Sequence, residues 1–173
     1  MSKGTRTYVT VYNFDESDLS KLDRRVSLED NNFFENIVPF RHEWGDIAHI
    51  ELEDLEFEIR EQRLTFTCET KGKPPIAWLK AASTTQFFED KLIVAASVNR
   101  YENYVEGFAI MSHDLLFETV LLDVDADVIG TMYENDEVDE IDEMIWRPIE
   151  LFSKECEKLY IPDETGGEEH EEV

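Results

Sequence analysis

Acidic side chains recur at alternate positions in one stretch of the chain, in a pattern that could bind calcium. Asp123, Asp125, Asp127 and Glu134 occupy positions one, three, five and twelve of the calcium-binding loop of EF-hand proteins. That loop also needs glycine at position six, where this chain has Val128, and a helix before it. The strict alternation of this stretch predicts a strand instead. We therefore interpret the aspartates as the solvated face of an edge strand and expect no metal or other cofactor.

A histidine beside an aspartate is the second arrangement that could do chemistry. His113 precedes Asp114, and such a pair could act as a general acid and base. Neither Ser97 nor Ser112 lies in the elbow motif that exposes a serine nucleophile, so the pair has no nucleophile to activate. Two further histidines flank a tryptophan in a predicted loop: His42, Trp44 and His49. We interpret the loop histidines as side chains satisfied by local hydrogen bonds.

Closely spaced carboxylates in residues 51–58 could hydrolyse a glycosidic bond, because that reaction uses two carboxyl groups facing each other across a cleft. They are Glu51, Glu53, Asp54, Glu56 and Glu58. The chain has 41 Asp and Glu residues, however, so close pairs arise by chance. No catalytic motif accompanies them, and the sequence predicts a protein without enzymatic activity.

The strongest pattern in the chain is an amphipathic helix predicted over residues 137–159. Its apolar positions recur at intervals of three and four residues: Val138, Ile141, Met144, Ile145, Ile149, Phe152 and Cys156. The opposite face is acidic: Glu137, Asp139, Glu140, Asp142 and Glu143. Pro148 is expected to kink or split the helix, because proline lacks an N–H and crowds the preceding turn.

Negative charge is concentrated in the last third of the 173-residue chain. Residues 114–173 contain 21 acidic and three basic side chains, whereas residues 1–113 contain 20 and 13, and the formal net charge is −25. Such a charge repels nucleic-acid phosphates and anionic membranes and attracts basic surfaces. We therefore expect no direct binding of nucleic acid or membrane, and a basic protein as partner.

Charge runs often serve only to keep a protein in solution, and that interpretation stays open here. A functional reading is favoured because the carboxylates lie on a predicted folded element, where mutual repulsion costs free energy that a basic partner would relieve. Carboxylates on a rigid surface can also imitate duplex DNA, which carries about one negative charge per 1.7 Å of axis. The predicted contact face is Asp136, Glu137, Asp139, Glu140, Asp142 and Glu143, extended by Asp123, Asp125 and Asp127.

The first two thirds of the chain must supply the folded body that positions this face. Strands are predicted where β-branched and aromatic residues alternate with polar ones, at residues 8–13, 50–59, 64–68, 92–98 and 104–111. A slip in the alternation at Asp54 predicts a bulge. Helices are predicted at residues 16–25, capped by Asp15 or Ser17, and at residues 75–84, which begin with proline. Residues 27–49 are predicted to be irregular, with large aromatic side chains that must be packed down.

This order predicts an α+β fold of the ferredoxin-like, split β-α-β type, with helices on one face of a mostly antiparallel sheet. An acidic C-terminal helical element is added to it. We expect a ferredoxin-like domain at residues 1–113, an acidic strand and helix extension packed on it at 114–160, and a disordered acidic tail at 161–173. The extension's apolar face needs a cover, either its own sheet or a second copy in a homodimer.

The chain has no apolar run of about 18 residues that would span a membrane. Its first residues lead directly into an alternating pattern without the apolar core of a signal peptide. We therefore expect a cytoplasmic protein. Cys68 and Cys156 are far apart in the sequence and have no metal-type spacing, so we expect free thiols.

Several short motifs agree in order with a known family. Residues 33–40 read Phe-Phe-Glu-Asn-Ile-Val-Pro-Phe, and Trp44–Gly45 follows; later come Thr65–Thr67, Pro74–Ile76 and Glu106–Gly107. This series resembles the Api92-like (YubB-type) ferredoxin-like domains of phages and plasmids, over about residues 6 to 112. The resemblance implies a fold and an origin in a mobile element, and no catalytic site.

The chain departs from that family after the Trp-Gly pair. The family usually repeats tryptophan and lysine there, whereas this chain reads Asp46–His49.

Two functions follow from these patterns. The first is a phage or plasmid accessory protein whose acidic surface mimics nucleic acid and inhibits a host nucleic-acid-binding defence complex, of the anti-CRISPR or anti-restriction type. The second is a non-catalytic binding module that uses the aromatic loop, with Phe40 and Trp44 as buried anchors in a protein partner. The two differ in their dependence on salt, because only the first rests on charge.

Overall fold

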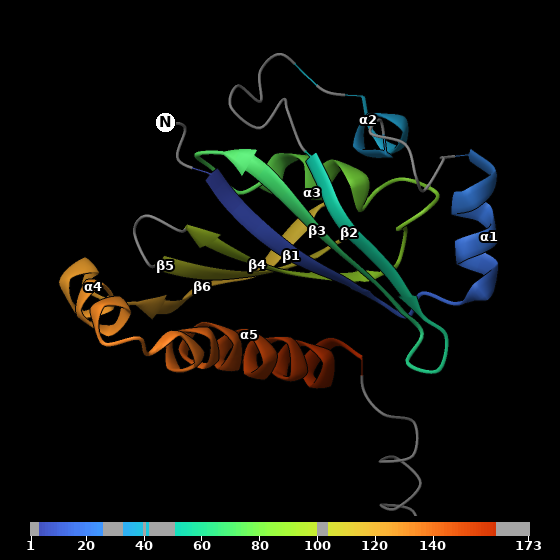
Figure 1. Ribbon diagram of the computed structural model, residues 1–173. Helices are drawn as coiled ribbons and strands as arrows, with labels where there is room; N and C mark the ends of the chain where they lie inside the picture. Colours follow the sequence, from blue (N-terminus) through green and yellow to red (C-terminus); the bar gives the residue numbers. More distant parts are fainter. Residues whose placement is uncertain (1–3, 26–32, 40, 42–50, 100–103, 162–173) are drawn as a thin grey trace, which may run out of the picture.

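A computed structural model describes residues 4–25, 33–39, 41, 51–99 and 104–161 of the chain. These residues form one six-stranded antiparallel sheet in the order β2-β3-β1-β4-β5-β6, with helices on both faces (Figure 1). The predicted α+β class is therefore confirmed. The elements are β1 (Gly4–Tyr12), α1 (Glu16–Arg25), α2 (Phe33–Ile37), β2 (Glu51–Glu58), β3 (Arg63–Lys71), α3 (Ile76–Ala82), β4 (Leu92–Asn99), β5 (Tyr104–Met111), β6 (Asp114–Asp123), α4 (Ala126–Glu134) and α5 (Val138–Tyr160).

One face of the sheet packs against α1, α2 and α3. Alternate side chains of the central strands, among them Val9, Phe66 and Ile93, form a single buried cluster with apolar side chains of these three helices. The buried Trp78 of α3 donates its indole N–H to the carbonyl oxygen of Phe34 in α2, at 3.1 Å. The bond satisfies the one polar group of that large side chain and joins the two helices over the sheet.

The opposite face is covered by α5, the acidic C-terminal helix, whereas the helices predicted within residues 1–113 lie on the first face as expected. Phe152 and Cys156 of α5 pack in one buried cluster with side chains of β1, β4 and β5, and Ile149 packs in a neighbouring cluster with β4 and β5. The physical reason lies in β4, where every residue from Leu92 to Val98 is buried. A strand that is apolar on both sides needs a layer on each.

The four-stranded ferredoxin-like arrangement is not confirmed, because the sheet has six strands. β1 lies between β3 and β4 and is antiparallel to both, and β5 and β6 then extend the sheet beyond β4. The turn from β5 to β6 is tight. Ser112 and His113 both have positive φ angles, 50° and 72°, which is the conformation of a two-residue hairpin turn that matches the strand twist.

Several local predictions are confirmed. Helix α1 spans the predicted residues, and Asp15 caps it: the Asp18 N–H donates to Asp15 Oδ1 at 2.9 Å, and the Asp15 N–H donates back to Asp18 Oδ2 at 3.0 Å. The register between β2 and β3 shifts between Leu52 and Asp54, at the predicted bulge.

The prediction of an irregular stretch is wrong for Phe33–Ile37, which forms α2 with three of its residues buried.

The strand predicted by the alternating stretch that contains Asp123, Asp125 and Asp127 is confirmed only as far as Asp123. β6 ends at Asp123, and α4 begins at Ala126. The Asp125 side chain accepts a hydrogen bond from the Asp127 N–H at 3.0 Å, so it caps the helix. The alternation of charged and apolar residues here is thus the sequence of a helix start.

Helix α5 is not split at Pro148, which lies inside a helix of 23 residues. Proline removes one backbone hydrogen bond, but Ile149 and Phe152, which follow it on one face of the helix, are both buried and hold the helix on the sheet.

None of the helices in the described parts of the chain is long and apolar enough to cross a membrane.

A glycine in β5 sets how closely α5 approaches the sheet, and its replacement is the first prediction. A methyl group at Gly107 would lie 2.7 Å from Cε1 of Phe152, and that ring is buried and cannot move aside freely. We expect Gly107→Ala to lower the free energy of unfolding by about 1–3 kcal/mol, the usual cost of overpacking a core. Urea unfolding followed by circular dichroism measures the change.

The matched control is Gly130→Ala in α4, where a methyl group would meet nothing within 4 Å. We expect this variant to be as stable as the parent protein or more stable by up to about 1 kcal/mol, because alanine favours helix more than glycine does. Equal loss of stability in both variants would contradict the close packing of α5 on β5.

The cap of α4 gives a second prediction. We expect Asp125→Ala to lower the free energy of unfolding by about 0.5–2 kcal/mol, because the orphan N–H of Asp127 loses its acceptor. Asp123→Ala removes the same charge from an exposed position nearby, and we expect less than about 0.5 kcal/mol of change. Thermal unfolding of the two variants at one salt concentration separates the cap from the charge. A smaller loss for Asp125→Ala than for Asp123→Ala would argue against the cap.

Candidate functional site

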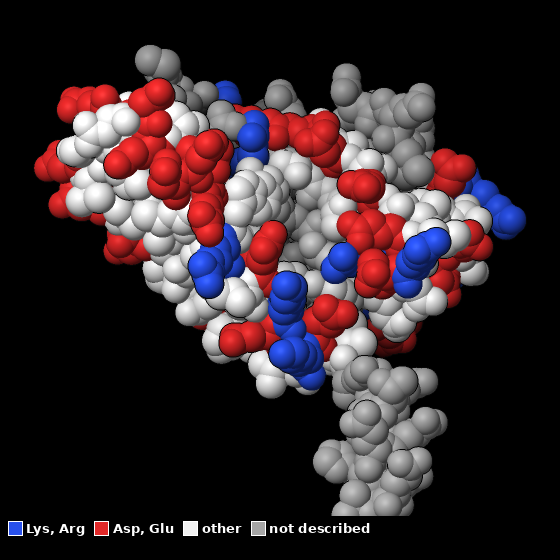
Figure 2. All heavy atoms as spheres, turned by 60° about the horizontal axis from the view of Figure 1, so that its bottom comes forward, with Lys and Arg blue, Asp and Glu red and all other residues white. Residues whose placement is uncertain are grey.

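Carboxylates gather at one end of the molecule, over the end of β6, α4 and the first turns of α5 (Figure 2). We call this surface the acidic lobe. Its carboxylates are Asp123, Asp125, Asp127, Glu134, Asp136, Glu137, Asp139, Glu140, Asp142 and Glu143. All are exposed except Glu137, which is half-buried. The structure thus brings all the predicted contact residues to one surface and adds Glu134 to them.

The turn between α4 and α5 holds the lobe together. The Asp136 N–H donates to the carbonyl oxygen of Tyr133 at 3.1 Å, and the Glu137 N–H donates to that of Met132 at 2.9 Å. This pair of bonds, with Asp136 at a φ of 61°, is the Schellman ending of a helix. The chain then turns directly into α5, so Glu134 at the end of α4 and the acidic first turn of α5 lie close together.

Each helix of the lobe contributes one buried isoleucine. Ile129 of α4 is 3% exposed and Ile141 of α5 is 2% exposed. Burying such a side chain contributes about 1.5–3 kcal/mol. Helices α4 and α5 contact each other, so the carboxylates of the lobe project from folded helices.

Some of these acidic residues also have structural roles. Asp125 caps α4, and Asp136 supplies the left-handed residue after it, a conformation that aspartate tolerates better than most residues. Asp127, Asp139 and Glu140 lie in first helical turns, where the helix dipole favours a negative charge. Asp142 and Glu143 lie beyond the first turn, so neither cap nor dipole accounts for them.

The charge of the lobe is hardly compensated. Among the described residues, its one ion pair joins Glu143 to Arg147 at 4.0 Å, and both side chains are more than 70% exposed. Such a pair contributes little. The remainder of α5 is different, because residues 144–160 contain three acidic and three basic side chains. The negative surface therefore ends after the second turn of the helix.

The spacing of charge in the lobe is close to that of DNA. Residues 137–143 carry five carboxylates, and an α-helix rises 1.5 Å per residue, so these charges span about 9 Å, or about one per 2 Å. Duplex DNA carries about one per 1.7 Å.

Two residues considered for catalysis from the sequence, Ser97 and His113, make structural contacts. Ser97 is buried, and its hydroxyl is bonded to that of Thr7 at 2.8 Å. The His113 backbone N–H donates to Ser83 Oγ at 2.8 Å, which fixes the β5–β6 turn, and no hydrogen bond joins His113 to Asp114. His42, His49, Phe40 and Trp44 lie outside the described residues.

The described residues contain no group of three or more His, Cys, Asp or Glu side chains placed to hold a metal ion. In the calcium-like series, Asp125 uses its carboxylate to cap α4. Cys68 and Cys156 are both buried free thiols, and they belong to clusters on opposite faces of the sheet. Burial raises the pKa of both thiols, to about 11 for Cys156, so they are unreactive at neutral pH.

A groove on the α5 side of the sheet was missed by the sequence analysis. It has a volume of about 730 Å³ and lies between α5 and the exposed faces of β1, β2 and β3. Its walls carry Asp54, Glu56 and Glu58 from β2 and Trp146 and Glu150 from α5. The β2 carboxylates belong to the closely spaced series at residues 51–58, but they lie far from Trp146 and Glu150 in the sequence, and no local motif links the two segments. Only the pairing of β2 with β3 and the position of α5 bring them together.

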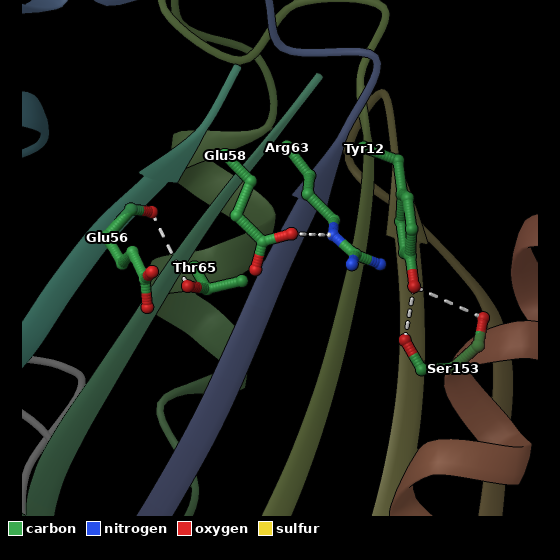
Figure 3. A network of polar contacts seen from close by, with 6 residues as sticks. All are labelled: Tyr12, Glu56, Glu58, Arg63, Thr65 and Ser153. Atoms are coloured by element: carbon green, nitrogen blue, oxygen red, sulfur yellow. Dashed lines mark hydrogen bonds and ion pairs between the residues drawn. The ribbon is translucent and has the colours of Figure 1, made fainter. Parts of the chain in front are cut away.

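A polar network borders the groove (Figure 3). Glu58 Oε2 accepts from Arg63 Nε at 2.7 Å, and the Thr65 hydroxyl donates to the Glu56 carbonyl oxygen at 3.4 Å. Across the sheet, the Tyr12 hydroxyl is bonded to the Ser153 hydroxyl of α5. Burial raises the pKa of Tyr12 despite that bond, so the phenol stays protonated and joins β1 to α5.

Comparison with known proteins does not extend this description. No protein-family model, no curated protein and no solved structure matches the chain. The resemblance to the Api92-like domains therefore stays a prediction from the sequence motifs.

Proposed function

We propose that the acidic lobe binds the nucleic-acid-binding surface of a basic protein and competes there with nucleic acid. The observation that carries this proposal is the concentration of nearly unpaired carboxylates on folded helices, with a charge spacing similar to that of DNA. A basic partner would relieve the repulsion among these carboxylates on binding. Long-range attraction would also speed the encounter.

The surface itself favours a protein partner over nucleic acid. A formal net charge of −25 repels phosphates, and the lobe offers no cation among the described residues except Arg147 at its border. A lysine- and arginine-lined channel is complementary to it in sign and spacing. The proposed activity is therefore inhibition by occupancy, without a catalytic step.

The finer parts of the proposal rest on the sequence motifs. We propose an accessory protein of a phage or plasmid that acts in the host cytoplasm against a defence complex, of the anti-CRISPR or anti-restriction type. We also propose that β1 to β4 correspond to a ferredoxin-like unit, to which β5, β6, α4 and α5 are added. The order β2-β3-β1-β4 and its antiparallel pairing support that correspondence.

Charge reversal in the lobe tests the function. The quadruple variant Asp139→Lys, Glu140→Lys, Asp142→Lys and Glu143→Lys leaves both ends of α4 intact. The parent protein, immobilised, is expected to capture a nucleic-acid-binding complex from bacterial lysate at about 0.15 M salt and to release it on addition of duplex DNA or at about 0.5 M salt, since salt screens exposed charges. We expect the variant to bind the captured complex at least about 30-fold more weakly, which is about 2 kcal/mol.

The matched control reverses four exposed acidic residues away from the lobe: Asp23→Lys, Glu35→Lys, Glu61→Lys and Glu89→Lys. It has the same net charge as the first variant, and we expect it to bind within about threefold of the parent protein, because distant exposed charges are largely screened. Thermal unfolding of all three proteins shows whether the fold is kept. Binding that survives reversal of the lobe, or a captured complex that duplex DNA does not release, would reject the proposal.

A further inference from the structure

Half of one sheet face is left open by the position of α5. The helix packs on β4, β5 and β6, and Figure 1 shows it running beneath that side of the sheet only. On the same side, the faces of β3 and β2 have no helix over them in the described parts of the chain, and β1 lies at the border, where α5 contacts Tyr8 and Tyr12. The groove described above lies where this open face meets the flank of α5.

The floor of the groove is half-buried, and one wall is aromatic. Thr10, Thr65 and Thr67 line it from neighbouring strands. Trp146 of α5 leans over Tyr8 of β1, with ring centroids 4.5 Å apart and the planes inclined by 58°. The Trp146 side chain is 41% exposed, so a large aromatic surface faces the open space beside the sheet.

Carboxylates stand on both sides of the open space. Asp54 and Glu56 belong to the β2 side and Glu150 to the α5 side, and none of these three forms an ion pair or hydrogen bond through its carboxylate with a described residue. Glu58 differs because it is paired with Arg63. Figure 2 shows acidic side chains on either side of the hollow on this face. The groove therefore has an excess of negative charge beside an aromatic wall.

This chemistry restricts what can occupy the groove. Phosphates of a nucleic acid would be repelled. A second copy of the chain has the same charge of −25, and the chain's own last twelve residues contain six acidic and no basic side chains. A cation is favoured by the carboxylates, and a planar one is favoured by the indole, because guanidinium groups stack on aromatic faces.

We propose that this groove, with Glu56 and Glu150 on its two sides and Trp146 as its wall, binds an extended, arginine-bearing segment of a protein partner. The methylenes of an arginine would lie over Tyr8 and Trp146, and its guanidinium would pair with the carboxylates. The inference goes beyond the proposed function, because it assigns a second surface with a different recognition chemistry and does not require the acidic lobe to bind anything.

The test uses acetylated, amidated hexa-arginine as the probe and titration calorimetry on the full chain at about 0.15 M salt. The groove variant is Glu56→Gln with Glu150→Gln, and the matched control is Asp23→Asn with Glu89→Gln, at exposed positions outside both the groove and the acidic lobe. Both remove two exposed negative charges. We expect the groove variant to bind the peptide at least about fivefold more weakly, which is about 1 kcal/mol, and the control to bind within about twofold of the parent protein.

The aromatic wall is tested at constant charge. Trp146→Leu is expected to weaken peptide binding at least about threefold, a loss in the range of an exposed cation–π contact. Leu151→Ala, which changes another exposed apolar residue of α5, should leave binding unchanged. In the parent protein, the peptide should shift the indole N–H resonance of Trp146, assigned with the Trp146→Leu variant, and leave that of the buried Trp78 in place.

Equal weakening by the groove variant and the control variant would show that hexa-arginine senses only the total charge, and it would overturn the proposal. So would saturation with the peptide without a shift of the Trp146 resonance. The result is separable from the proposed function. The quadruple variant of the lobe (Asp139→Lys, Glu140→Lys, Asp142→Lys and Glu143→Lys) is expected to lose the captured complex whether or not the groove binds arginine. If the lobe captures no complex, the peptide measurements on the groove are unaffected.

Discussion

The contact of Phe152 with Gly107 sets how closely α5 lies on the sheet. The ring lies so close to β5 that a methyl group on the glycine would overlap it, and it also stacks on Phe117 of β6 at 6.1 Å. Because these contacts hold the middle of α5, the helix ends have little freedom. One end carries the acidic residues Asp139 and Asp142, and the flank of the helix forms one wall of the groove.

The central strand explains why α5 is on the sheet at all. β4 is buried along nearly its whole length, so neither of its faces can be left to water. The first face is covered by α1, α2 and α3 through one large cluster. Among the described residues, the second face is covered by α5 alone, and a single helix is too narrow to cover six strands. Because one helix is narrower than the sheet, part of this face stays uncovered, and the groove lies there.

Acidic residues have different physical meanings in different parts of this molecule. Asp15 and Asp125 satisfy backbone N–H groups at helix starts, and Glu58 pairs with Arg63. Asp142 of the lobe and Glu56 of the groove have neither role, so their charge is available to a partner. The net charge of −25 therefore includes carboxylates with structural roles and others, such as these two, without one.

The sequence alone determined the local elements, because caps, turns and periodicity act over a few residues. It located α1 with its cap at Asp15, the bulge near Asp54 and the length of α5, and it identified the acidic residues of the lobe. It misread residues 123–128, since a charged alternation is shared by edge strands and helix starts. Only the tertiary structure decided that α5 covers the second face and that Glu56 and Trp146 line one groove. Those placements depend on strand pairing and on which strand needs cover from both sides, and no local pattern encodes them.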